Sequence, residues 1–386
     1  MKGASVFFAI CLLVGGNVWA QSPLDSLTQA LQTLQENSGL PGFAVAILDA
    51  EEIKYTQGFG YADLREKVAY TPQTVQNIAS ISKTVIGVNL MKAVEMGKLQ
   101  LDDPINKYLP FEVNNPWFPE TPITIRHLAT HTSSIRDKNY MHSYLLEETD
   151  AAQDPDVPKA WATFIGKHEH MDMESFFRRC LVPKGKWYKK KNFLKELPGS
   201  TASYSNIGAS LAAFVLEQAV GEPFYEFSRK HLTGPLQMLH SDWMADKVVD
   251  EPLATLYFQD GKRVPGYSLI TYPDGSFRTS VADMSLYLQE MINGYMGESD
   301  YLQAASFKAL LPGDDDESRV FWGMGQTSRN IGHNGGDPGV RTDMHFNADT
   351  KIGYILFCNM SVEDNDKLHA QYLKILELLH DYGPRL

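Results

Sequence analysis

Strand-like runs lie near both ends of this 386-residue chain, while its long middle reads as helical stripes and irregular segments. Short runs rich in β-branched and aromatic residues predict strands. The predicted strands cover 42–48 and 53–61 near the N-terminus, and 320–324, 330–333, 340–346 and 352–358 near the C-terminus. This arrangement predicts an α/β (α+β) fold, in which an antiparallel sheet is built from the N- and C-terminal segments, is flanked by helices and carries an inserted, mostly helical lobe.

Apolar residues at helical spacing flank the predicted strands. Helices are expected around 24–34, from about 80 to 96, at 207–220, at 282–291 and at 368–379. The expected sheet lobe comprises about 21–95 and 320–386. The expected helical lobe comprises about 96–319 and contains a charged insertion at about 137–197. The active site is expected where the lobes meet.

Residues 1–20 have the composition of a targeting segment. Lys2 precedes an apolar run, and Ala20 stands before Gln21. This pattern predicts a secretory signal peptide that is cleaved after Ala20, leaving one domain at 21–386. The apolar run is short for a membrane span, so we expect an exported protein, periplasmic or secreted, with no integral span after cleavage. A formal net charge of −12 argues against nucleic-acid binding.

The cysteines and histidines give weaker indications. After signal cleavage only Cys180 and Cys358 remain, and whether they pair is left open. His127 and His131 have a spacing that metal sites use, but no further ligand set accompanies them. They are interpreted as structural, and no metal or organic cofactor is expected.

The stretch from Asn77 to Val88 carries the most specific chemistry. Ser80 and Lys83 stand three residues apart at the start of an apolar helical run, so they share one helix face. A lysine amine among apolar neighbours can help to remove the serine proton, and backbone N–H groups at a helix start suit an oxyanion. The bare spacing also occurs by chance, so its order with other elements matters.

Two further elements follow in the chain. Tyr204 and Asn206 stand at the mouth of an apolar helix, where the tyrosine lies off the apolar stripe. His333 and Gly335 belong to a His-Asn-Gly-Gly run near a predicted strand.

In this order the chain resembles the serine β-lactamases and penicillin-binding proteins, most of all the branch of class C β-lactamases, D-amino-acid peptidases and family VIII esterases. The flanking segments 128–133, 198–206, 234–238 and 332–340 share the resemblance, which covers most of the mature chain. Two features depart from the family pattern: Ser134 replaces a common glycine, and the charged insertion is longer than in compact β-lactamases.

The resemblance implies a role for each motif residue. Ser80 matches the acylated nucleophile, Lys83 its partner and Tyr204 the usual candidate base. Asn206 and His333 would orient the substrate, and His333-Asn334-Gly335 takes the place of Lys-Thr-Gly. The backbone N–H groups of Ser80 and Gly336 would hold the oxyanion.

We therefore expect an exported serine hydrolase that acts through an acyl-enzyme on small-molecule or short-peptide substrates, D-amino-acid peptides or amides, or short esters. The alternatives are a class C-type β-lactamase and a penicillin-binding or sensor protein that scarcely turns over. The natural substrate and the oligomeric state are left open.

Overall fold

A computed structural model describes residues 22–148, 150–248, 253–313 and 318–386. The predicted signal peptide lies outside these residues. Within them, no helix is both long and apolar enough to cross a membrane.

The central element of the described chain is an eight-stranded antiparallel sheet with the order β3-β2-β1-β12-β11-β10-β9-β8. Its strands are β1 (Gly42–Leu48), β2 (Ile53–Asp63), β3 (Val68–Ala69), β8 (Ser318–Arg319), β9 (Trp322–Met324), β10 (Asn330–Asp337), β11 (Val340–Asn347) and β12 (Gly353–Cys358). The two chain ends meet where β1 pairs with β12, with Phe43 opposite Cys358 and Leu48 opposite Gly353. The sheet therefore confirms the predicted fold class.

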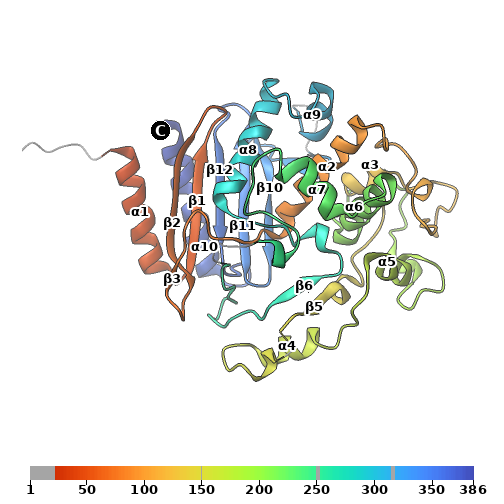
Figure 1. Cartoon of the computed structure of the whole chain (residues 1–386), viewed down its shortest axis with the longest axis horizontal. Coiled ribbons are helices and arrows are strands. Elements are labelled where there is room, and N and C mark those ends of the chain that lie inside the picture. The colour runs from red at the N-terminus through yellow and green to blue at the C-terminus, as the bar shows by residue number, and fades with distance from the viewer. Residues whose placement is uncertain (1–21, 149, 249–252, 314–317) are drawn as a thin grey trace, which may run out of the picture.

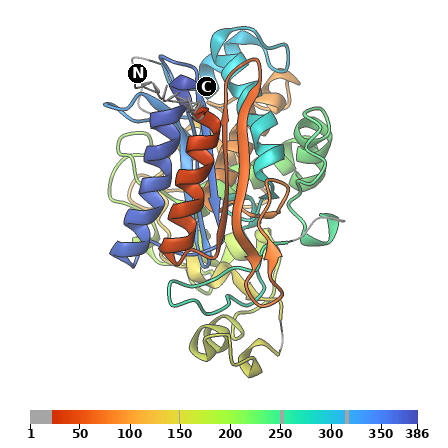
Figure 2. The same ribbon diagram turned by 90° about the vertical axis from the view of Figure 1, so that its left-hand side faces the viewer.

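Helices cover both faces of this sheet (Figures 1 and 2). Helices α1 (Pro23–Ser38) and α10 (Asp366–Tyr382) lie side by side on one face, and α8 (Val281–Met296) packs on the other. Successive β1 residues point to opposite faces. Phe43 and Val45 accordingly pack with Leu27 of α1, whereas Ala44 and Ala46 belong to the core on the α8 side. Because β1 is buried on both sides, it reads as one continuous apolar run.

A second group of helices lies beyond α8 (Figure 1). It comprises α2 (Ser82–Glu95), α3 (Ile125–Ala129), α4 (Lys159–Ile165), α5 (Met173–Leu181), α6 (Asn206–Val220), α7 (Phe224–Ser228) and α9 (Ala304–Leu310). Two short ladders join its loops: β4 (Gln76–Asn77) with β7 (Arg278–Thr279), and β5 (Tyr144–Leu146) with β6 (Tyr267–Leu269). The expected division into two lobes with an insertion at 137–197 stays a prediction.

Strand β10 is longer than the sequence indicated. The strand expected at 330–333 continues to Asp337, because the glycines after His333 pair in register with β11, with Gly335 opposite Thr342. Glycine is a poor strand former, which is why the run looked like a loop.

Cys180 and Cys358 are free, buried thiols on α5 and β12. Burial raises the pKa of each thiol to about 12, so neither behaves as a reactive thiolate near neutral pH.

Candidate active site

Ser80 lies in a tight 3₁₀ turn, Ala79–Ile81, directly before α2. The residue before it, Ala79, has a φ of 47°, which is unusual for a residue with a side chain. Strained backbone of this kind persists only where the surrounding packing enforces it, and it often marks functional sites. The turn leaves Ser80 half-buried, between the start of α2 and the sheet.

Lys83 is fully buried, and its amine contacts the serine directly. Its Nζ lies 3.0 Å from Ser80 Oγ and donates to the backbone carbonyl of Asp274 at 2.6 Å. A buried amine requires such partners, because an unpaired one would be costly to desolvate. The predicted serine and lysine are therefore held within hydrogen-bond reach.

Tyr204 stands at the start of α6 with 48% of its surface exposed. Its ring lies over the Lys83 amine, with 5.1 Å from Nζ to the ring centroid. The ring of His131 packs against it at 4.4 Å between centroids. Tyr204 thus faces the Ser80–Lys83 pair from the helical side.

The start of α6 is fixed by a carboxylate from the preceding segment. Asp137 accepts hydrogen bonds from Ser205 Oγ at 2.8 Å and from the backbone N–H groups of Asn206 and Ile207 at 2.7 and 3.1 Å. A carboxylate at a helix N-terminus satisfies free N–H groups and complements the helix dipole. Asp137 therefore holds in place the segment that presents Tyr204 and Asn206.

Strand β10 supplies the opposite wall. Alternation along the strand places His333, Gly335 and Asp337 on one face. A Cβ added to Gly335 would lie 2.5 Å from the carbonyl oxygen of Ile78 and 3.0 Å from the Cβ of Ala79. Only glycine allows β10 to approach so closely the turn Ala79–Ile81 that carries Ser80, here called the nucleophile turn.

His333 completes the wall near Tyr204, with 6.2 Å between ring centroids. Burial, and then the charge of Lys83, lower its pKa to about 4, so the imidazole is neutral near neutral pH. Its Nδ1 lies 2.5 Å from the carbonyl oxygen of Asn334. A carbonyl only accepts, so Nδ1 carries the proton and Nε2 is left as an acceptor.

Arg341 does not supply the positive charge that a lysine at position 333 would carry. It pairs with Glu363 at 3.0 Å and lies over the ring of Tyr372 in α10, across the sheet from the nucleophile turn. Its neighbour on β11, Thr342, is the one that faces the turn, donating to the carbonyl of Ile78 at 3.0 Å.

The sequence did not single out two carboxyl groups beside the site, the fully buried Asp274 and the half-buried Asp337. Asp274 accepts from Tyr140 at 2.5 Å and Ser210 at 2.7 Å, and burial raises its pKa to about 6. Asp337 accepts from Tyr144 at 2.5 Å and Tyr267 at 2.7 Å, and burial raises its pKa to about 7. Asp274 lies in an ordinary Pro-Asp-Gly turn, so no local pattern marks it.

His131 also has a place in the site, although the sequence indicated only a structural role. Its Nδ1 accepts from the backbone N–H of Ser205 at 3.2 Å while its ring packs on Tyr204. Burial, with smaller contributions from Lys83 and His333, lowers its pKa to about 3. No group of three or more potential ligands that could hold a metal ion occurs in the described parts of the chain.

The curated relatives that span most of the chain include a penicillin-binding protein and a peptidase. A "Putative penicillin-binding protein PbpX" of Bacillus subtilis is 26% identical over 91% of this chain and 78% of its own length. A "D-alanyl-D-alanine-carboxypeptidase/endopeptidase AmpH" of Escherichia coli is 26% identical over 79% of this chain and 72% of its own.

A solved structure shares the fold. The octameric penicillin-binding protein homologue from Pyrococcus abyssi superposes with a TM-score of 0.68 at 22% identity, covering 92% of this chain and 77% of that one. The family model described as Beta-lactamase matches residues 27–377, which is most of the chain. The chain therefore belongs to the beta-lactamase family.

Proposed function

We propose that this protein is a serine hydrolase that cleaves amide or ester carbonyls through an acyl-enzyme on Ser80. The observation that carries the proposal is the 3.0 Å contact between Ser80 Oγ and the fully buried amine of Lys83. A serine hydroxyl is a weak nucleophile unless an adjacent group manages its proton, and this contact supplies such a group.

In the proposed reaction, Ser80 Oγ attacks the substrate carbonyl while its proton passes to the Lys83–Tyr204 pair. The same pair returns a proton to the leaving group, and water then releases the acyl group in a second, similar cycle. The carbonyl of Asp274 fixes the Lys83 amine at 2.6 Å, so that the amine stays in reach of the serine throughout.

The oxyanion would be held by the backbone N–H groups of Ser80 and Gly336. Gly335 packs against Ala79, so β10 and the nucleophile turn are adjacent, as such a pair of donors requires. Losing one such donor typically costs about 3 kcal/mol of barrier.

The substrates that best suit this site do not depend on a carboxylate. A neutral His333 whose Nε2 is an acceptor gives an anion neither a charge nor a hydrogen bond. This favours D-amino-acid peptides or amides, or short esters, over carboxylate-bearing β-lactams. The endopeptidase part of the name of the Escherichia coli relative agrees with the peptide class, because an endopeptidase cleaves a bond away from the terminal carboxylate.

The test is covalent labelling with a fluorophosphonate and, on separate unlabelled protein, hydrolysis of p-nitrophenyl acetate. Wild type should gain the probe mass at Ser80 and turn the ester over, whereas Ser80→Ala should do neither and remain folded. A Ser80→Ala variant that keeps more than about one per cent of the activity would show that another group is the nucleophile.

The time course of labelling also separates turnover from trapping. With a fluorescent penicillin, an adduct that persists for hours without product release would favour the penicillin-binding or sensor alternative. Efficient nitrocefin hydrolysis would favour a β-lactamase.

A further inference from the structure

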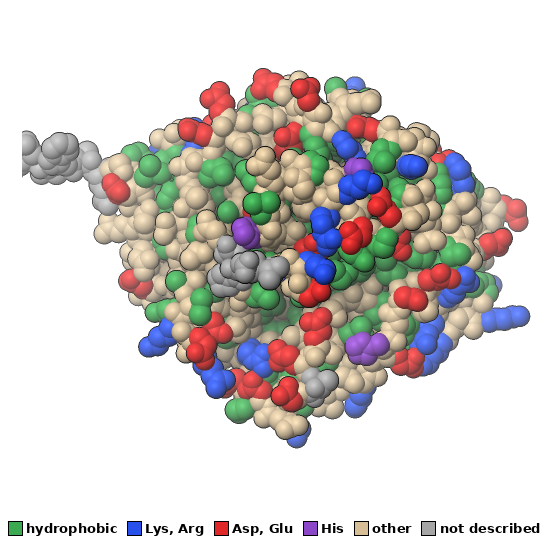
Figure 3. All heavy atoms as spheres, in the orientation of Figure 1, with side chains coloured by type: hydrophobic (Ala, Val, Ile, Leu, Met, Phe, Trp, Pro, Cys, Tyr) green, Lys and Arg blue, Asp and Glu red, His purple; other side chains and the backbone are tan. Residues whose placement is uncertain are grey.

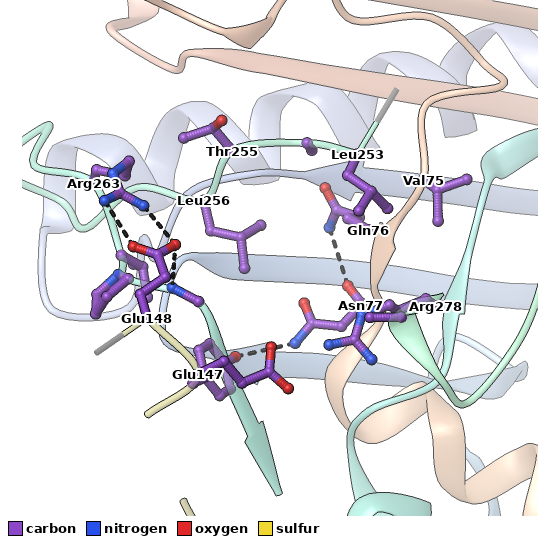
Figure 4. A pocket seen from close by; sticks show the side chains of 16 residues that line it. Val75, Gln76, Asn77, Glu147, Glu148, Leu253, Thr255, Leu256, Arg263 and Arg278 are labelled. Carbon is purple, nitrogen blue, oxygen red and sulfur yellow. Dashed lines mark hydrogen bonds and ion pairs between the residues drawn. The ribbon is translucent and has the colours of Figure 1, made fainter. Parts of the chain in front are cut away.

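A cavity of about 270 Å³ lies beside β4, the short strand that precedes the nucleophile turn (Figure 4). It is bounded by the β4–β7 ladder, by β6 and by the loops around Glu147 and Leu256. Asn77 lines it and precedes Ser80 by three residues. Three residues span at most about 10 Å, so this wall of the cavity lies within about 10 Å of Ser80 along the chain.

The Asn77 amide has an unused acceptor in this wall. Its Nδ2 donates to the Tyr267 hydroxyl at 3.0 Å, and that hydroxyl donates in turn to Asp337 at 2.7 Å. This chain fixes the amide, so Oδ1 is the free end. Asn77 is only 9% exposed, and Oδ1 has no hydrogen-bond partner among the residues that the structure describes.

A buried acceptor without a donor is costly, and a ligand N–H is one way to satisfy it. Figure 4 shows the Asn77 and Glu147 side chains pointing into the same space. Glu147 is exposed, and its carboxylate adds a negative charge at this wall.

Two carboxylates, Glu147 and Glu148, and two guanidinium groups, Arg263 and Arg278, line the cavity. Arg263 is occupied by a bidentate pair with Glu148 and by Asp154 at 2.8 Å. Arg278 is the other lining cation, and its Nη1 donates to the Trp243 carbonyl at 3.3 Å. Because Glu148 is paired with Arg263, Glu147 and Arg278 are the lining charges outside that pair.

We propose that this cavity is a subsite of the Ser80 centre that binds a cationic amine of the substrate, with Asn77 Oδ1 and the Glu147 carboxylate as acceptors. The inference rests on the proposed hydrolase function and narrows its substrate class. An ammonium group carries three donors and no acceptor, which matches this pair of acceptors. The preferred substrate is then an amide or ester whose acyl part bears an amine several bonds from the scissile carbonyl.

The test compares two esters of matched length, 6-aminohexanoyl and heptanoyl p-nitrophenyl ester, which differ only in an ammonium or a methyl group at the end. Wild type should favour the amine by at least about tenfold in kcat/KM, because the free acceptor rejects a methyl group. Added salt should lower only the amine rate.

Glu147→Gln removes the charge and keeps the shape, so it should lower the amine-to-methyl ratio by about three- to fivefold, the range of an exposed ion pair. Asn77→Leu removes the acceptor and should lower the same ratio. Glu51→Gln makes the same change at an exposed turn between β1 and β2, away from the cavity, and should leave the ratio unchanged.

A wild-type ratio of one or less would overturn the subsite, as would a ratio that both Glu147→Gln and Asn77→Leu leave unchanged. The heptanoyl ester keeps this result separate from the proposed function. If Ser80 hydrolyses that ester without preferring the amine, only the subsite fails. If neither ester is hydrolysed, the proposed function fails.

Discussion

Replacing Gly335 by alanine tests whether the close approach of β10 to the nucleophile turn controls the activity. The new Cβ would lie 2.5 Å from the carbonyl oxygen of Ile78, whereas an ordinary contact begins near 3.4 Å. The turn or the strand must therefore move by about 3.4 − 2.5 = 0.9 Å. Because Ile78 is two residues before Ser80, the nucleophile shares this movement.

A misplacement of about 1 Å in a catalytic group can cost about 10²-fold in rate. We therefore expect Gly335→Ala to lower kcat/KM for p-nitrophenyl acetate by about 10²-fold, and to slow fluorophosphonate labelling of Ser80 in parallel. Overpacking should also cost about 1–3 kcal/mol of unfolding free energy, measured by urea denaturation.

The matched control is Gly313→Ala, where an added Cβ would have no neighbour within 4 Å among the residues that the structure describes. This variant should keep wild-type kinetics and stability. If Gly335→Ala retains kcat/KM within about threefold of wild type, the tight contact does not position the nucleophile and the reasoning fails.

Three further predictions concern charge and proton transfer. Lys83→Ala and Tyr204→Phe should each slow acylation by about 10²- to 10⁴-fold. The rate loss of the double variant should be smaller than the product of the two single losses, because both residues serve one proton relay. Full additivity in single-turnover kinetics would contradict a shared relay. His333→Lys should raise the nitrocefin-to-ester ratio of kcat/KM, because it adds a positive charge where the imidazole is neutral; an unchanged ratio would remove that argument. Burial raises the pKa of Asp274 from 3.8 to about 6. As pH rises, this carboxyl group therefore ionises in the unfolded chain before it ionises in the folded one. The free energy of unfolding should fall by about 3 kcal/mol as pH rises through the two pKa values. Asp274→Asn cannot ionise, so urea denaturation at pH 4.5 and 7.5 should show a smaller loss of stability than in wild type; equal losses would mean that Asp274 is not the group responsible.

Local patterns in the sequence were sufficient for the main elements. Apolar runs predicted β1 and β12, and helical stripes predicted α1 and α10. In both cases the spacing of apolar residues along the chain reveals the type of element and its buried face. The same patterns predicted that β10 ends at His333, because glycine gives no strand signal by itself. Their place in the sheet comes from pairing with β11.

The site residues also divide into those that local spacing predicts and those that only the folded chain brings together. The sequence by itself determined the Ser80–Lys83 pair, because three-residue spacing at a helix start puts both side chains on one face. Only the tertiary structure decided which groups surround that pair. The Asp274 carbonyl that holds Lys83 comes from 191 residues further along, and the Asn77 amide is fixed by a tyrosine 190 residues away. Such partners leave no local pattern, because they become neighbours only when the chain has closed its sheet and packed its helices against it.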